Sequence, residues 1–320
     1  MYKPGYPAGF FNLTMNQPFH KTVIIIAGPT AVGKSAAAIS MAKHFGTEII
    51  SADSRQCYKE LNIGVARPSQ EQLKEVPHYF IATHSVNEEV NAVVFEKYAL
   101  EKVNQIHKHL DTVIMVGGTG LYIRAFADGL DDMPAVDPVK RSMINKQYVE
   151  KGLSWLQGQV KEKDPIFFEK GEILNPHRLI RALGIFETTG QSILSFQKGE
   201  KATRPFNIIK VALELPKENL HQNINYRTEE MIKQGLVDEV QSLEPFQELN
   251  ALRTVGYTEI FNFLEQKISL AEAAEQIKIN TRQYAKRQMT WFRKDDEIKW
   301  FSPGDVSGII SSLVNSGLGS

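Results

Sequence analysis

Cysteine, net charge and long apolar runs are what this sequence lacks. Its 320 residues include one cysteine, Cys57, so neither an intrachain disulfide nor a cysteine-based zinc site can form. The 37 basic and 37 acidic residues cancel, which excludes a wholly basic nucleic-acid-binding protein but not a local basic face. The longest strongly apolar stretch, residues 23–27, is far too short to span a bilayer. The N-terminus does not have the pattern of a signal peptide, so we expect a soluble, cytoplasmic protein.

The overall composition is typical of a globular protein. Hydrophobic residues make up 42% and charged residues 23%, which allows a large core and excludes wholesale disorder. The length suggests two domains. Residues 1–20 are rich in Pro, Gly and Asn and predict a flexible leader, in which Met15 is an alternative start.

Alternating strand and helix patterns predict a parallel sheet. Short β-branched runs predict strands at 22–28, 47–54, 112–120 and 207–215, and helical patterns lie at 35–45, 93–109 and 121–130. Residues 138–200 and 216–293 are mostly helical in pattern. We therefore expect an α/β fold with a P-loop core in residues 21–132 and 201–320. A helical insertion domain at 133–200 interrupts this core, and a helical C-terminal part packs on it.

A phosphate-binding motif lies between the first predicted strand and helix. It has the pattern GxxxxGK[ST], in which glycines let backbone amides turn toward a phosphate and the helix N-terminus adds positive charge. Lys34 can neutralise phosphate oxygens, and the Ser35 hydroxyl can hold Mg²⁺. The motif predicts a polyphosphate ligand without identifying it as ATP. Its residues are Gly28, Pro29, Thr30, Ala31, Val32, Gly33, Lys34 and Ser35.

Two further strand ends carry polar or glycine-rich residues. Because ligands of open parallel sheets lie at the carboxyl ends of strands, Asp53 is expected near the phosphate loop. It is either a general base or metal-positioning carboxylate, or only a helix N-cap. The run 117–120, GGTG, permits close approach of a ligand to the backbone, and Thr119 can donate a hydrogen bond to a phosphate or a base.

Basic residues gather near the C-terminus. The segment 277–294 has no acidic residue and carries Lys278, Arg282, Lys286, Arg287, Arg293 and Lys294. Such a run is either a solvated helix face or a contact for RNA phosphates, and its concentration in a neutral protein favours RNA.

Eight segments share their sequence and order with one known family. They are GPTAVGKS (28–35), SADSRQCYKELNIGVARP (51–68), PHYFI (77–81), VGGTGLYIRAF (116–126), NPHRLIRALGIFETTG (175–190), RTEEMIKQGLVDEV (227–240), RTVGYTE (253–259) and TRQYAKRQMTWFR (281–293). Together they resemble the tRNA dimethylallyltransferase family, also called tRNA isopentenyltransferases. Two positions depart from its pattern: Pro176 stands where an acidic residue is usual, and Gly184 where Glu is usual.

This resemblance implies transfer of a dimethylallyl group from dimethylallyl diphosphate to the exocyclic amine of the adenine immediately 3′ of the anticodon in tRNA. Mg²⁺ and the phosphate loop would hold the leaving diphosphate. The residues implied in catalysis are Asp53, Lys34, Thr119 and Arg141. The residues implied in tRNA binding are Asp53, Ser54, Arg55, Gln56, His177, Arg178, Leu179, Ile180, Arg181, Arg282, Lys286 and Arg287. Nothing implies a membrane or a protein partner, and we expect a monomer.

Three other functions remain open at this point. A P-loop small-molecule kinase or NTPase would transfer or hydrolyse nucleotide phosphate without a prenyl donor. An adenylate prenyltransferase would accept free AMP or ADP in place of tRNA. A non-catalytic RNA-binding module would bind RNA without turnover, and an intact phosphate loop would be surplus to it.

Overall fold

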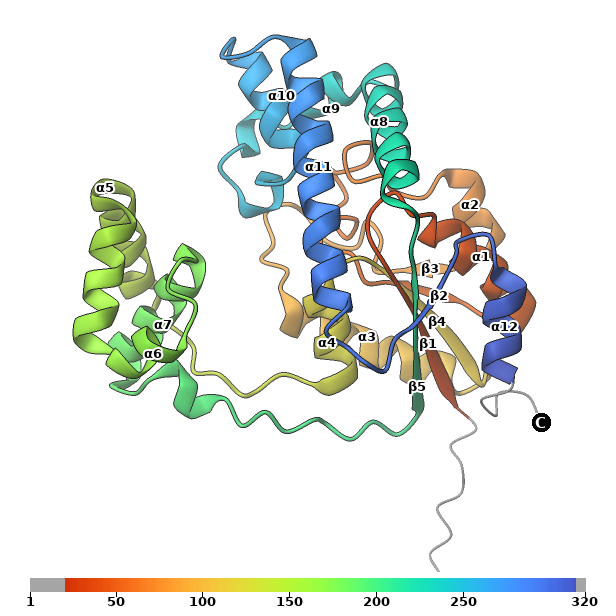
Figure 1. Cartoon of the computed structure of the whole chain (residues 1–320), viewed down its shortest axis with the longest axis horizontal. Coiled ribbons are helices and arrows are strands. Elements are labelled where there is room, and N and C mark those ends of the chain that lie inside the picture. The colour runs from red at the N-terminus through yellow and green to blue at the C-terminus, as the bar shows by residue number, and fades with distance from the viewer. Residues whose placement is uncertain (1–20, 315–320) are drawn as a thin grey trace, which may run out of the picture. The chain divides into compact units, whose positions relative to one another are not determined.

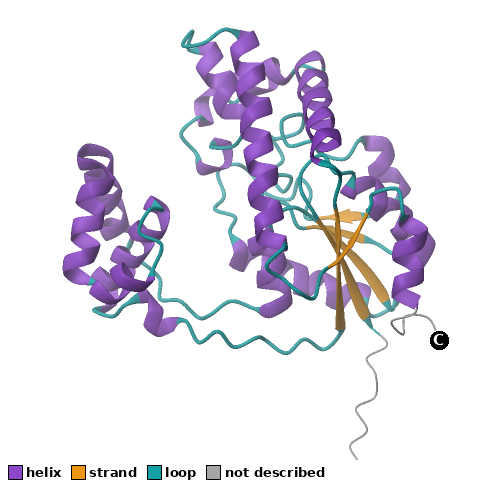
Figure 2. Ribbon diagram, in the orientation of Figure 1, coloured by secondary structure: helices purple, strands orange, loops and turns teal. Residues whose placement is uncertain are grey.

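The computed structural model describes residues 21–314, so the predicted leader at 1–20 lies outside the described residues. Its centre is a six-stranded sheet in the order β3-β2-β4-β1-β5-β6, in which every neighbouring pair is parallel (Figure 2). The strands are β1 (Thr22–Ala27), β2 (Ile49–Ser51), β3 (His78–Tyr79), β4 (Thr112–Val116), β5 (Asn207–Leu213) and β6 (Lys299–Phe301).

The sheet is buried on both faces because its central strands have apolar residues at successive positions. In β1, Val23 and Ile25 pack into one core cluster and Ile24 and Ile26 into another, as the two-residue period of a strand requires. The covering helices are α1 (Lys34–Phe45), α3 (Ala92–Ile106), α4 (Gly120–Asp128) and α12 (Val306–Val314), with α2 (Gln70–Glu75) beside them.

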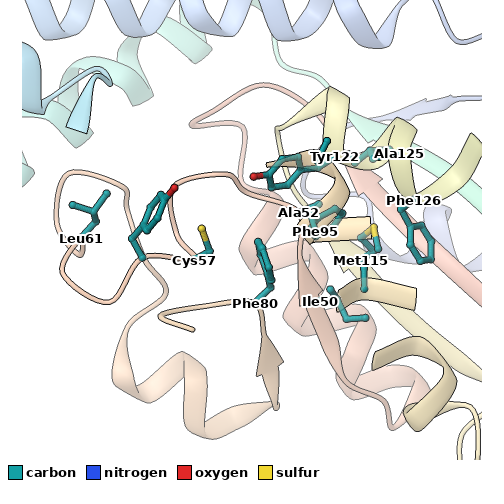
Figure 3. Packing of buried hydrophobic residues seen from close by; sticks show 14 of the residues in the cluster. Ile50, Ala52, Cys57, Leu61, Phe80, Phe95, Met115, Tyr122, Ala125 and Phe126 are labelled. Carbon is teal, nitrogen blue, oxygen red and sulfur yellow. The ribbon is translucent and has the colours of Figure 1, made fainter. Parts of the chain in front are cut away.

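Aromatic side chains fill the larger cluster (Figure 3). The rings of Phe95 and Tyr122 stack with centroids 4.6 Å apart, and Phe80 meets Phe95 edge to face at 5.1 Å. Such pairs are worth about 0.5–1.5 kcal/mol beyond the area that they bury. The cluster therefore fixes the positions of α3 and α4 relative to the strands whose ends carry the polar segments.

A group of helices lies beyond the carboxyl ends of the strands (Figure 1). The helix α11 contacts α8 and α10 and places Ala273, Ile277 and Phe292 in the larger cluster. A helical C-terminal part packed on the core is what the sequence predicts. The helices of this group are α8 (Lys217–Lys233), α9 (Leu236–Ser242), α10 (Tyr257–Leu264) and α11 (Leu270–Phe292), with the 3₁₀ turns η2 (Glu244–Phe246) and η3 (Asn250–Leu252).

Residues 128–203 form a compact unit of their own, and the remaining described residues form the other. The predicted helical insertion, 133–200, lies inside this smaller unit. Its helices begin alike, with Asp or Asn as the cap and proline as the first helical residue, a strong start signal. They are α5 (Pro138–Lys163), α6 (Pro165–Lys170) and α7 (Pro176–Thr189), with the 3₁₀ turn η1 (Ile193–Phe196).

The two departures from the family pattern have local explanations. Pro176 is the first residue of α7, where its missing N–H costs no helical hydrogen bond. At Gly184 a Cβ atom would lie 2.7 Å from Cγ1 of Val136, so this face of α7 has no room for a side chain.

The α/β fold with a parallel sheet is confirmed, and some element boundaries differ from the prediction. The second strand ends at Ser51, earlier than predicted, and α2, β3, β6 and α12 were not predicted. Within residues 21–314, no helix is long and apolar enough to cross a membrane.

Candidate active site

The phosphate loop joins β1 to α1 and contacts the backbone of β5. At Gly28 the φ angle is +138°, and a Cβ atom there would lie 2.7 Å from the carbonyl oxygen of Leu213, so only glycine fits. Gly33 precedes α1 in a left-handed conformation and offers no side-chain cap. In the described part of the chain, the backbone N–H groups of Gly33, Lys34 and Ser35 donate no hydrogen bond. Three free N–H donors at the start of a helix are typical of an anion-binding site.

Lys34 is partly buried, and its Nζ donates a hydrogen bond to the carbonyl oxygen of Pro29 at 2.6 Å. Burial, and after it the nearby Arg227 cation, lower the pKa of Lys34 from 10.5 to about 7, although the Asp53 carboxylate acts in the opposite direction. The ammonium is thus poorly compensated within the protein, and an anionic ligand would stabilise its charged form.

A second cation, which the sequence does not predict, reaches the loop from α8. Arg227 is partly buried, and its Nη1 lies 3.4 Å from Oγ1 of Thr30. Asn223, one turn earlier, donates from Nδ2 to the carbonyl oxygen of Ala31 at 3.1 Å. Burial lowers the pKa of Arg227 from 12.5. Arg227 is the first residue of the segment 227–240 that carries the family resemblance, but its contact with a loop about 190 residues earlier in the chain depends on packing alone.

Asp53 follows β2, and its carboxylate oxygens differ in what they contact. Oδ1 accepts the N–H of Arg55 at 2.9 Å and of Gln56 at 3.2 Å, which turns the chain and ends the strand. Oδ2 accepts no hydrogen bond from the described residues. No helix begins at this point of the described chain, so the helix N-cap interpretation of Asp53 is wrong. One oxygen supports a turn instead, and the other remains for a proton or a substrate. The charge of Asp53 acts on Lys34, so the two lie in one site as predicted from the strand ends.

The GGTG run lies against the end of β2. A Cβ atom at Gly117 would lie 2.1 Å from the carbonyl oxygen of Ala52, so the two strand ends meet only because this residue is glycine. Oγ1 of Thr119 accepts the N–H of Ser54 at 3.1 Å. Tyr284 of α11 lies near Thr119 and Asp53, and burial, together with the Asp53 charge, raises its pKa to about 12. Thr119, from the segment after β4, and Tyr284, from α11, thus lie beside the segment that carries Asp53 and Ser54.

Gln56 is held by its own loop. Its Nε2 donates to the carbonyl oxygens of Val65 at 3.2 Å and Ala66 at 3.0 Å, and its Oε1 accepts from Oγ of Ser51 at 3.2 Å. A contact of Ser54, Arg55 or Gln56 with tRNA stays a prediction.

The basic residues of α11 fall into two groups. Lys278 and Arg293 form ion pairs with Glu229 at 3.1 Å and Glu214 at 3.4 Å. In the other group, Arg282 is partly buried, with Nη2 bonded to Oδ1 of Asn225 at 2.6 Å, and Lys286 and Arg287 are exposed.

The remaining predicted residues belong to the smaller unit. Arg141 on α5 is exposed, as are His177, Arg178 and Arg181 on α7. The side chains of Leu179 and Ile180 are buried in the core of this unit, so the predicted tRNA contact could come only from their backbone. Helical periodicity explains this, because two adjacent apolar residues turn inward while the neighbouring basic residues face outward.

The donor set suits magnesium only in part. Among the described residues, no group of three or more His, Cys, Asp or Glu side chains could hold a metal. The exposed Ser35 hydroxyl and Oδ2 of Asp53 offer two oxygens. Mg²⁺ usually takes one or two side-chain oxygens and completes its shell with substrate phosphates and water. These residues therefore fit Mg²⁺ together with a bound diphosphate, and magnesium stays a prediction.

Comparison with known proteins identifies the family. The model described as IPP transferase matches residues 56–295. The tRNA dimethylallyltransferases of Cytophaga hutchinsonii and Christiangramia forsetii are 42% and 45% identical over 294 residues, which cover 92% of this chain and 97% of each relative. A solved tRNA isopentenylpyrophosphate transferase from Bacillus halodurans is 30% identical with a TM-score of 0.67, covering 92% of this chain and 95% of its own. A eukaryotic dimethylallyltransferase, 24% identical with a TM-score of 0.75, shares the fold. The resemblance found in the sequence is confirmed: the chain belongs to the tRNA dimethylallyltransferase family.

Proposed function

We propose that this protein transfers a dimethylallyl group from dimethylallyl diphosphate to the exocyclic amine of the adenine 3′ of the anticodon in tRNA. The observation that carries the proposal is one site in which Lys34 and Arg227 lie at a phosphate loop and the charge of Asp53 acts on Lys34. Relatives that are named tRNA dimethylallyltransferases and match over nearly their whole length support it.

The phosphate end of the site would stabilise the leaving group. The bond between the allylic carbon and the diphosphate oxygen breaks, and its electron pair stays on the diphosphate. The backbone N–H groups of Gly33, Lys34 and Ser35 and the two cations would lie beside this developing charge and would lower the barrier. Mg²⁺ held by Ser35 and the diphosphate oxygens would supply further charge neutralisation.

The other end of the site would handle the nucleophile. The adenine amine forms the new carbon–nitrogen bond and then carries a proton that must leave. Oδ2 of Asp53 has no hydrogen bond from the described residues and can accept that proton as general base. The Thr119 hydroxyl, which accepts the N–H of Ser54, would orient the adenine beside Asp53.

The tRNA would be held by basic surfaces. On the core unit these are Lys286 and Arg287, with Arg282 beside them, and on the smaller unit Arg141, His177, Arg178 and Arg181. Phosphate contacts of this kind give affinity and a dependence on salt.

A choice of acceptors separates this proposal from the alternatives. The protein is incubated with labelled dimethylallyl diphosphate, Mg²⁺ and an anticodon stem-loop RNA, a stem-loop with guanine in place of the target adenine, or AMP. Labelling of the first RNA alone supports the proposal. Labelling of AMP in preference to the RNA would make this an adenylate prenyltransferase, and phosphate transfer from ATP without a prenyl donor would make it a kinase.

A further inference from the structure

A buried glutamine joins two walls of the candidate site. Gln288 on α11 is 7% exposed, and both atoms of its amide are used. Its Oε1 accepts the backbone N–H of Thr30 in the phosphate loop at 2.8 Å, and its Nε2 donates to the carbonyl oxygen of Gly118 at 2.8 Å. A buried amide with both bonds satisfied holds two backbones at a fixed separation, because leaving either bond unmade costs about 1–3 kcal/mol.

The glycines opposite α11 make room for this contact. A Cβ atom at Gly118 would lie 2.2 Å from Nε2 of Gln288. One turn further along α11, the Trp291 ring lies against Gly120 in the same way, where a Cβ atom would come within 2.2 Å of Cδ1. The face of α11 formed by Tyr284, Gln288 and Trp291 thus fits directly into the GGTG run.

The bond to Thr30 also determines which donors of the loop meet the ligand. The N–H of Thr30 is occupied by Gln288, whereas those of Gly33, Lys34 and Ser35 remain for an anion. The other end of the same amide holds the run that carries Thr119, which contacts Ser54 beside Asp53. One side chain therefore connects the part that holds the leaving group to the part that holds the base.

We infer that Gln288 is a positioning residue for prenyl transfer: it sets the separation between the diphosphate loop and the Thr119–Asp53 side of the site. This inference rests on the proposed function. A displacement of about 1 Å between reacting groups can cost on the order of a hundredfold in rate. Loss of the amide should therefore reduce turnover far more than it reduces binding.

The test compares Gln288→Met with Gln276→Met. Methionine has nearly the shape of glutamine but neither of its hydrogen bonds, and Gln276 is exposed on the same helix. In Gln288→Met we expect kcat to fall by about 30- to 100-fold, with tRNA affinity within threefold of the wild type. Gln276→Met should match the wild type. A kcat for Gln288→Met within threefold of the wild type, or a defect confined to tRNA affinity, would overturn the inference.

A second variant and a second measurement keep the test independent of folding and of the acceptor. Gly118→Ala would displace the amide by contact, so it should lower kcat too, and the double variant with Gln288→Met should be less than additive. Full additivity would count against the shared contact. Hydrogen exchange at the Thr30 amide needs no substrate: it should accelerate at least tenfold in Gln288→Met, and unchanged exchange would refute the bond. A wild-type protein without transfer activity would refute the proposed function instead.

Discussion

The unusual pKa of Lys34 makes donor binding depend on pH. With a pKa of about 7, only about a tenth of the Lys34 side chains carry a proton at pH 8 before the ligand binds. A bound diphosphate brings negative charge to Nζ and raises that pKa again, so binding above pH 7 takes up a proton. The affinity for dimethylallyl diphosphate should then fall by up to about tenfold, or about 1.4 kcal/mol, for each pH unit above about 7.

The same pKa shift also makes the free energy of unfolding depend on pH. The folded pKa of Lys34 is depressed below its ordinary value of 10.5, so between about pH 7 and 10.5 the unfolded chain binds the extra proton. The Lys34 contribution to the free energy of unfolding of the unliganded protein therefore rises with pH across this window. Below about pH 7 both states are protonated, and folding carries the full cost of burying the charge.

Calorimetry of Lys34→Arg tests this reasoning. Because arginine stays charged, the affinity of Lys34→Arg for dimethylallyl diphosphate should not fall above about pH 7 in the way expected for the wild type. The ionisation of the ligand itself affects both proteins equally. Titrations at pH 8 in two buffers of different ionisation enthalpy should show uptake of about 0.9 proton in the wild type, and about that much less in Lys34→Arg. Lys43→Arg, on the same helix but paired with Glu75 at the surface, is the matched control. Equal proton uptake in all three proteins would refute the assignment.

Three further predictions concern other parts of the site. Asp53→Asn keeps an oxygen for the turn but loses the base, so turnover should fall by about a hundred- to ten-thousandfold with both substrates still bound; near-normal turnover would leave Asp53 a cap, and rescue by added Mg²⁺ would make it a metal ligand. Neutralising Arg282, Lys286 and Arg287 together should weaken tRNA binding and reduce the slope of log K against log salt by on the order of one unit for each lost phosphate contact. An unchanged slope would mean that these residues form only a solvated helix face. Gly117→Ala would press a Cβ atom against the end of β2 and lower the free energy of unfolding in urea by about 1–3 kcal/mol. Gly158→Ala, inside α5 with open space around it, should instead raise it by up to about 1 kcal/mol.

The parts of the site that could be predicted from the sequence are those formed by short continuous segments of the chain. The phosphate loop is a continuous motif, and Asp53 and Thr119 follow strands whose carboxyl ends must meet at one edge of the sheet. Arg227 and Gln288 could not be predicted, because each reaches the loop from a helix about 190 to 260 residues away. Both residues lie in segments that carry the family resemblance, 227–240 and 281–293, but nothing in those segments shows that their side chains reach the phosphate loop.

The fold shows the same division. The buried runs of β1, β4 and β5 are long enough to recognise, whereas β3 has two residues and β6 three, too few for a period. The predicted second strand extends too far because hydrogen bonds to the Asp53 side chain make the turn after it, and no Gly or Pro marks that turn in the sequence. Leu179 and Ile180 were grouped with the basic residues around them, although the helix directs them into the core.

The central claim is prenyl transfer to one adenine of tRNA at this site. Its most direct test is to react the protein and Asp53→Asn with bulk tRNA, Mg²⁺ and labelled dimethylallyl diphosphate, and then to locate the label by nuclease fragmentation and mass spectrometry. The account predicts dimethylallyl adenosine immediately 3′ of the anticodon in the wild-type reaction, and at least a hundredfold less product at equal times in the variant. Label on another nucleoside, no label on tRNA, or equal product from the variant would contradict it.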